Sequence, residues 1–198
     1  LEDDELIHFV DGIMDNSRYL SQVIEDFKNY IKNDKEKESF DINEAVRKSL
    51  IIADSSIRND KLILTTNLQD GIIIENFQNE LIQALVNIIN NAKDALVERI
   101  EKEEERLIFI DTFKIKDKAI ISIRDSAGGI SNDVLPKIFE PYFTTKDKNL
   151  GTGLGLYMTY KIIIDSMEGD LKVRNKDIIF DKKLYKGAEF RIILDLDE

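Results

Sequence analysis

The chain has 198 residues, 42% of them hydrophobic, so it is long enough for one domain with an appendage and can bury a sizeable core. Cysteine is absent and no apolar run approaches the roughly 20 residues of a membrane helix, which favours a reducing, aqueous compartment without disulfides or a membrane span. The net charge of −11 disfavours nucleic acid as a partner, because sequence-independent binding to phosphates depends on clustered Lys and Arg.

The first predicted element is a helix over residues 6–31 with a narrow apolar seam. Its apolar residues recur at alternating spacings of four and three, which is typical of helices that pair in bundles. We expect it to pair with another helix, from this chain or from a second copy, and packing on the main domain is the alternative. The chain then divides into a helical segment at 1–33, a charged linker at 34–39 and a main domain at 40–198.

Strands and helices alternate in the predicted main domain. Strands are predicted at residues 40–42, 61–68, 72–75, 107–114, 118–124, 170–174, 178–181 and 188–194, and helices at 42–57, 77–104 and 154–167. Asp41 and Glu44 form a capping box for the first helix, Asn76 is the expected N-cap of the second, and Asp70 and Gly71 mark a turn between two strands. The sum is an α+β fold, a two-layer α/β sandwich with helices on one face of a mixed sheet.

Two asparagines on the long helix form the first pattern that carries chemistry. Asn87 and Asn91 are spaced i, i+4 and share a face, on which Glu80 and Asp94 extend a polar stripe. A neutral amide offers oxygen to a hard cation without adding charge near a polyphosphate, so the pair predicts magnesium ligation. Taken alone, the pattern is more typical of the solvated face of an amphipathic helix.

Asp125 stands at the end of a predicted strand and is followed by Ser-Ala-Gly-Gly-Ile, which includes Gly129. A carboxylate at the base of a pocket can accept hydrogen bonds from the exocyclic amine of adenine, each worth roughly 1.5 to 3 kcal/mol. The small residues after it keep side chains away from a purine. An ordinary turn is an equal alternative for this segment alone.

A second Gly-rich loop, which contains Gly153, Leu154, Gly155 and Leu156, directly precedes a predicted apolar helix. Glycines let backbone N–H groups converge and a helix N-terminus adds partial positive charge, so the loop predicts a phosphate cradle, with a structural turn as the alternative. This cradle is a local remedy for the repulsion between an acidic chain and a polyphosphate. A dinucleotide fingerprint is disfavoured because Leu156 stands at its last glycine, and no Gly-Lys-Ser/Thr closes a Walker A loop.

Residues 137–146 lie between the two Gly-rich loops and contain Phe139, Phe143, Thr145 and Lys146. The two phenylalanines are expected to anchor the segment on the core. Lys146 can then reach phosphates, so that the segment folds over a bound nucleotide as a lid. Plain core anchors without a lid are the alternative.

These four elements, in this order, resemble the N, G1, F and G2 boxes of sensor histidine kinases, within the superfamily that includes gyrase and mismatch-repair ATPases. The resemblance covers essentially the whole chain and implies their ATP-binding fold, preceded by the second helix of a dimerisation hairpin. It implies ATP and Mg²⁺ as cofactors, with Asn91 as the metal ligand. The residues that it implies for ATP binding are Asn87, Asn91, Asp125, Gly129, Thr145, Lys146, Gly153, Leu154, Gly155 and Leu156.

The resemblance further implies a protein-histidine kinase that transfers the γ-phosphoryl group of ATP to a histidine on a helix upstream of Leu1. The single histidine, His8, is followed by Phe9 rather than by an acidic or amide residue, so we expect a surface residue there and no nucleophile in the chain. The implied protein is a homodimer through the N-terminal helix, acts on a response-regulator receiver domain and is cytoplasmic, with upstream segments as a potential membrane anchor. A hydrolysing ATPase of the same superfamily and a regulatory nucleotide-binding module are the alternatives.

Three positions near the boxes are compared with the family pattern. Gly187 resembles the final glycine before the last strand, and Ala127 stands where many members have glycine. Glu189 is expected at the position of a Thr or Ser that helps to hold adenine through water. We therefore expect the pocket to tolerate Ala127 and to lack this water-mediated contact.

Overall fold

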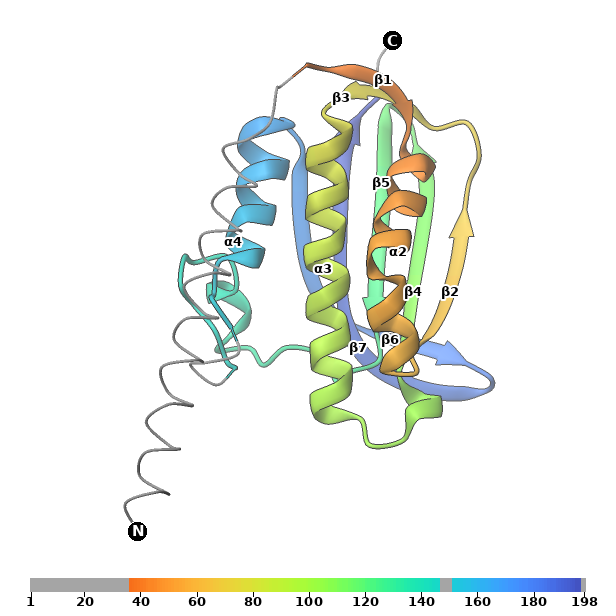
Figure 1. Ribbon diagram of the computed structural model, residues 1–198, viewed down its shortest axis with the longest axis vertical. Helices are drawn as coiled ribbons and strands as arrows, with labels where there is room; N and C mark the ends of the chain where they lie inside the picture. The colour runs from red at the N-terminus through yellow and green to blue at the C-terminus, as the bar shows by residue number, and fades with distance from the viewer. Residues whose placement is uncertain (1–35, 147–150, 197–198) are drawn as a thin grey trace, which may run out of the picture.

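The computed structural model describes residues 36–146 and 151–196 (Figure 1). The helix predicted at 6–31 and His8 lie outside the described residues. The first strand, β1 (Glu38–Asp41), begins two residues before the expected start of the main domain. No helix in the described ranges has the length and apolarity needed to cross a membrane.

A five-stranded mixed sheet forms one layer of the domain and has the strand order β2-β4-β5-β7-β6. Its strands are β2 (Ile63–Leu68), β4 (Leu107–Ile115), β5 (Lys118–Asp125), β6 (Asp170–Phe180) and β7 (Lys183–Asp195). β2 runs parallel to β4, and the other neighbouring pairs are antiparallel. In the second half of β7, the buried residues Phe190, Ile192 and Leu194 alternate with less buried ones because successive side chains of a strand point to opposite faces. The central strand β5 is buried continuously from Ala119 to Ile123.

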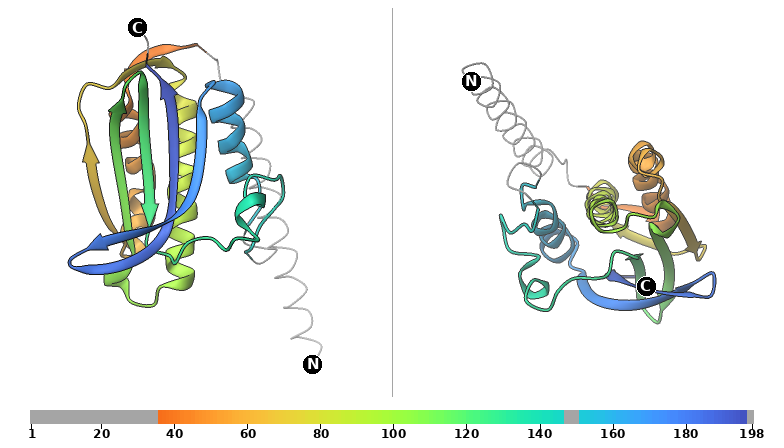
Figure 2. Two further views of the ribbon diagram at one scale, coloured as in Figure 1. Left: turned by 180° about the vertical axis from the view of Figure 1, so that it is seen from behind. Right: turned by 90° about the horizontal axis from the view of Figure 1, so that it is seen from below.

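Three helices form the second layer and cover one face of the sheet (Figures 1 and 2). They are α2 (Ile42–Asn59), α3 (Gln78–Arg99) and α4 (Gly155–Tyr160), and α4 continues into a wider π-type segment at Lys161–Ser166. The main core lies between these helices and the sheet and includes Leu81, Leu85 and Ile88 of α3. The expected two-layer α+β sandwich is therefore confirmed.

The turn at Asp70 and Gly71 does not join two paired strands. β3 (Ile73–Asn76) pairs with β1 in a separate two-stranded sheet, whereas β2 pairs with β4. Phe40 and Ile74 are partners in this small sheet and both are buried, so the apolar pattern of each strand is satisfied at a distance from β2. The turn residues correctly indicate a bend in the chain but not which strands pair.

Several element boundaries differ from the prediction. α3 ends at Arg99 rather than near residue 104, and Glu103–Glu105 forms a single 3-10 turn. The strands predicted at 170–174 and 178–181 are one strand, β6, which joins β7 through a two-residue turn. Asp181 and Lys182 have φ of 46° and 63°, as a type I′ hairpin turn requires, although neither is the glycine that usually signals it.

The helix caps also differ in detail from those expected. The Asp41 side chain accepts a hydrogen bond from the backbone of Asn43 at 2.9 Å, while Glu44 accepts one from Gln78 instead of closing the capping box. Phe77 is the N-cap residue of α3, and the side chain of Asn76 accepts the N–H of Phe77. These local bonds set where α2 and α3 begin and hence how α3 lies along the pocket described below.

Candidate functional site

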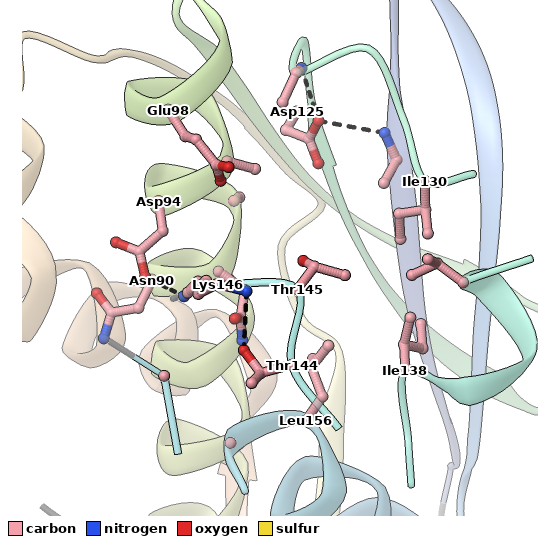
Figure 3. Close-up of a pocket in the computed structure, with 18 of the residues that line it drawn as sticks. Asn90, Asp94, Glu98, Asp125, Ile130, Ile138, Thr144, Thr145, Lys146 and Leu156 are labelled. Atoms are coloured by element: carbon pink, nitrogen blue, oxygen red, sulfur yellow. Dashed lines mark hydrogen bonds and ion pairs between the residues drawn. The ribbon is translucent and has the colours of Figure 1, made fainter. Parts of the chain in front are cut away.

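A pocket of about 320 Å³ lies between α3, the loop after β5 and the segment that precedes α4. It brings together nine of the ten predicted site residues: Asn87, Asn91, Asp125, Gly129, Thr145, Lys146, Gly153, Gly155 and Leu156. Leu154 is the exception, because its side chain is buried in the protein and its carbonyl accepts the N–H of Met158 in the first turn of α4. Figure 3 shows Asn90, Asp94 and Glu98 along α3 on one side of the pocket and Asp125 and Ile138 on the other.

Asp125 lies at one end of the pocket and is only 4% exposed. Its Oδ1 accepts hydrogen bonds from the backbone of Ala127 at 2.8 Å and of Ala188 at 3.3 Å. Burial raises the pKa of Asp125, although these two bonds and the charge of Arg99 act in the opposite direction. In the described part of the chain its other oxygen accepts no hydrogen bond, so Asp125 can still accept one from a ligand.

Gly187 on β7 packs directly against the backbone of Asp125. A Cβ atom at this position would lie 1.5 Å from the Asp125 carbonyl oxygen, so a larger residue would displace the aspartate. This close approach explains why the glycine that resembles the final glycine of the family pattern is needed: it lets β7 deliver the N–H of Ala188 to the carboxylate.

At the other end of the pocket, α3 meets the second Gly-rich loop through its two asparagines. Asn87 donates to the carbonyl of Gly155 at 3.3 Å, and Asn91 donates to the carbonyl of Asn87 at 2.8 Å. Both amide nitrogens are thus used by backbone carbonyls, which leaves the two amide oxygens as acceptors for a cation or another donor. Hard cations such as Mg²⁺ take this type of oxygen ligand.

The Gly-rich loop is itself held by the segment before it. Gly153 has a φ of +66°, and a Cβ atom there would lie 2.4 Å from the carbonyl carbon of Tyr142. The N–H of Tyr142 donates to the carbonyl of Gly153 at 3.0 Å. The packing of the loop against Tyr142 therefore requires a glycine at 153, because both the backbone conformation and the available space exclude a side chain there.

Lys146 reaches across the pocket to α3. Its Nζ lies 2.6 Å from Oδ2 of Asp94, and Nζ of Lys93 lies 2.9 Å from the other oxygen. Burial alone would raise the pKa of Asp94, but hydrogen bonds and attraction from Lys146 and Lys93 lower it. The ion pair between Lys146 and Asp94 thus places a positively charged side chain in the pocket of a protein whose net charge is negative.

Sequence reasoning missed several lining residues. Glu98 stands four residues after Asp94, so the i, i+4 spacing that picked out Asn87 and Asn91 could have extended the stripe to it. Glu80, by contrast, belonged to the expected stripe but is buried beside Ser166 and does not line the pocket. The other missed residues are Asn90, Ala92, Ala95, Arg99, Val134, Ala188 and Phe190. The remaining lining residues stand within the motifs that the sequence indicated, and they are Ala127, Ile130, Ile138, Phe143, Thr144, Gly151 and Thr152.

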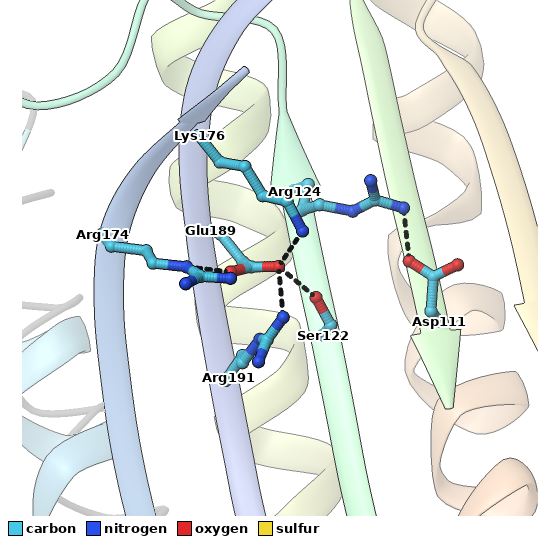
Figure 4. Close-up of polar contacts among 7 residues, drawn as sticks. All are labelled: Asp111, Ser122, Arg124, Arg174, Lys176, Glu189 and Arg191. Atoms are coloured by element: carbon cyan, nitrogen blue, oxygen red, sulfur yellow. Dashed lines mark hydrogen bonds and ion pairs between the residues drawn. The ribbon is translucent and has the colours of Figure 1, made fainter. Parts of the chain in front are cut away.

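The expectation that Glu189 lies at the adenine end of the pocket is wrong. Ala188 lines the pocket, and Glu189, the next residue on β7, points to the opposite face of the sheet (Figure 4). There its side chain is bound by Arg174, Lys176 and Arg191. Ala188, which lines the pocket instead, has no hydroxyl group.

The two-layer fold, with a buried carboxylate at one end of the pocket and two amides and a glycine loop at the other, defines an ATP-binding catalytic domain of the histidine kinase type. The family described as histidine kinase-, DNA gyrase B-, and HSP90-like ATPase matches residues 76–198, which is more than half of the chain. The chain therefore belongs to this family.

Curated relatives with this domain are kinases of bacterial signalling. Sporulation kinase C of Bacillus subtilis is 28% identical over 157 residues, which are 78% of this chain and 33% of that protein. The signal transduction histidine-protein kinase AtoS of Escherichia coli is 31% identical over 158 residues, which are 79% of this chain and 23% of that protein. The chain thus spans a third or less of these relatives.

Solved structures support the same fold. The catalytic domain of histidine kinase ThkA in a nucleotide-free form has a TM-score of 0.66 and 26% identity, and the match covers 81% of this chain and 95% of that one. Full-length ShkA in complex with AMPPNP has a TM-score of 0.70 at 19% identity, covering 94% of this chain and 38% of that one, and so supports the fold alone.

Proposed function

We propose that this chain is the ATP-binding portion of a sensor histidine kinase that transfers the γ-phosphoryl group of ATP to a histidine on another helix. One observation carries the proposal: Asp125, the pair Asn87 and Asn91, and the loop that contains Gly153 and Gly155 line one pocket. The family match and relatives named as kinases, one of them as a histidine-protein kinase, support it.

In this proposal the nucleotide lies along α3. Asn87 and Arg99 are 12 positions apart, which corresponds to about 18 Å of helix, long enough for a nucleotide triphosphate to lie along it. The free oxygen of Asp125 accepts the exocyclic amine of adenine at one end. The backbone N–H groups near Gly153 and Gly155 and the ammonium of Lys146 receive the phosphates at the other.

The residues at the phosphate end fit a magnesium ion. Asn91, with Asn87 beside it, would offer an amide oxygen because its nitrogen already donates to a backbone carbonyl. When bound with ATP, Mg²⁺ neutralises phosphate charge and holds the phosphates in a reactive arrangement. The neutral amides suit this role, since a carboxylate would repel the triphosphate.

The transfer forms a bond between an imidazole nitrogen and the γ-phosphorus and breaks the bond to the oxygen that remains on ADP. Such a reaction needs mainly positioning and charge neutralisation, so the residues of this chain hold the triphosphate while the acceptor histidine comes from elsewhere. We place the acceptor on a helix that pairs with residues 6–31 in a homodimer. Kinase ThkA is recorded in complex with response regulator TrrA, and we propose a receiver domain of this kind as the partner.

We also propose a cytoplasmic position, since the absence of cysteine accords with a reducing compartment.

Incubation of the full-length protein with γ-labelled ATP and Mg²⁺ tests the function. We expect an acid-labile, base-stable phosphohistidine, which Asn91→Ala should abolish. Steady ATP hydrolysis by the 198-residue chain without a histidine-bearing partner would favour a hydrolase instead. ATP binding without any phosphohistidine in the full-length protein would favour a regulatory module.

A further inference from the structure

The loop that follows Asp125 is held by an asparagine from a strand far away in the chain. The side chain of Asn175, on β6, accepts the N–H of Ile130 at 2.8 Å and donates to the carbonyl of the same residue at 2.7 Å. A carboxamide is the side chain that can satisfy both groups of one backbone residue, because it carries an acceptor and a donor side by side. Asn175 itself does not line the pocket, whereas Ile130 does.

This loop needs such a tether because two consecutive glycines lie within it. Gly128 and Gly129 have φ of +82° and +85°, and glycine loses more backbone freedom on ordering than any other residue. A Cβ atom at Gly129 would lie 2.6 Å from Oδ1 of Asn175, so the asparagine is in direct contact with the turn that it holds. Replacing Gly129 would therefore disturb the same contact.

A second tether reaches the loop from the opposite layer. Nη1 of Arg99, at the end of α3, donates to the carbonyl of Gly129 at 2.8 Å. The N–H of Gly128 donates to the carbonyl of Lys186 at 2.9 Å. The wall of the pocket beside Asp125 is thus fixed from α3, β6 and β7, and Asn175 supplies two of these bonds.

We propose that Asn175 is a positioning residue for the base of the nucleotide: it holds Gly129 and Ile130 in place as the wall against which the purine packs. The inference rests on the proposed ATP-binding function. It concerns the base end alone, because the loop with Gly155 contacts Asn87, which lies 12 positions before Arg99 on α3.

The test compares Asn175→Ala with Asn67→Ala. Both asparagines are exposed on edge strands of the same sheet, but Asn67 lies on β2, at the edge opposite β6. Neither change leaves a buried polar group without a partner, so both variants should fold. Calorimetry of the 198-residue chain would measure the affinity for Mg-ATP, and competition against ATP would measure the affinity for magnesium tripolyphosphate, which lacks a base.

We expect Asn175→Ala to weaken ATP binding about 3- to 10-fold, as the loss of two exposed hydrogen bonds implies. Tripolyphosphate binding should stay unchanged, and Asn67→Ala should match the wild type for both ligands. Unchanged ATP affinity, or an equal loss for ATP and tripolyphosphate, would overturn the inference. Failure of the wild type to bind ATP would instead refute the proposed function.

Discussion

Asp125 and Glu189 lie on neighbouring strands, β5 and β7, and are 4% and 1% exposed, but their burial has opposite outcomes. Among the described residues, the hydrogen-bond partners of Asp125 are the backbone N–H groups of Ala127 and Ala188, and burial raises its pKa. Burial also acts to raise the pKa of Glu189, but hydrogen bonds from Lys176 and Arg174 and the charge of Arg191 outweigh it and lower the pKa to about 2.

The difference indicates that Glu189 stabilises the fold, whereas Asp125 is available to bind a ligand. Glu189 has its charge balanced by three cations on the outer face of the sheet, so it contributes to stability and offers nothing to a further partner (Figure 4). Asp125 has an unfilled capacity to accept a hydrogen bond at the pocket. Functional sites often retain such locally unfavourable groups at a cost in stability.

Asp125→Asn should produce the largest effect and affect binding alone. Asparagine keeps the oxygen that accepts from Ala127 and Ala188, but its amide nitrogen cannot accept the amine of adenine. We expect ATP affinity to fall by about 10- to 100-fold, which corresponds to roughly 1.5 to 3 kcal/mol. The ligand-free domain should be equally stable or slightly more so at pH 7, because a buried charge is removed.

Isothermal titration and chemical denaturation measure these two quantities on the same sample. An ATP affinity within about twofold of the wild type would show that Asp125 does not contact the base.

Glu189→Ala should have the opposite effects, lowering the stability of the domain without changing its affinity for ATP. It leaves Arg174, Lys176 and Arg191 without their shared anion, and breaking a buried ion pair on one side costs about 3–5 kcal/mol. We expect about 1–3 kcal/mol here, because the Arg174 side chain is 56% exposed and water can replace part of the interaction. ATP affinity should be unchanged.

Urea denaturation and titration with ATP at a temperature where both proteins are folded provide the measurement. A large loss of ATP affinity with unchanged stability would mean that the outer face of the sheet belongs to the site after all.

The residues that line the pocket were easier to predict from the sequence than the pairing of the strands was. Each motif lies on one local element, and the spacing of Asn87 and Asn91 is set by helix geometry, so these positions follow from local rules. Pairing of β3 with β1 is a non-local choice that the turn at Asp70 and Gly71 cannot encode. Turn residues indicate where the chain bends, whereas the hydrophobic faces of distant strands determine which strands pair.

The expectation for Glu189 is wrong by one residue of β7. Successive side chains of a strand point to opposite faces, so a shift of one residue moves a predicted contact from the pocket at Ala188 to the outer face at Glu189. Leu154 sits among pocket residues in sequence but turns its side chain into the protein. The tethers from Arg99 and Asn175 could not be found from motifs, because they join residues 30 and 45 positions apart in the chain.

Acidification should have smaller effects than these substitutions. Protonation of Asp125 and of Glu189 should change the stability of the fold in opposite directions. Asp125 has a raised pKa, so it takes up a proton above the range near pH 3.9 where an ordinary aspartate does. Its protonation stabilises the ligand-free fold and removes an acceptor for adenine. As the pH falls from 7, we therefore expect the ATP affinity of the wild type to decline at a higher pH than the titration of an ordinary aspartate would produce.

The Asp125→Asn variant is the control for this profile, because ATP phosphates also titrate in this range and the variant reports their effect alone. Glu189 has a lowered pKa, so its contribution to stability is complete above about pH 4.5 and is lost as the pH falls toward about 2. Denaturation curves of the wild type and Glu189→Gln should therefore converge at the acid end. Parallel ATP profiles for wild type and Asp125→Asn would show that Asp125 carries no titrating contact to the nucleotide, and the contrast between the two buried carboxylates would then reduce to stability alone.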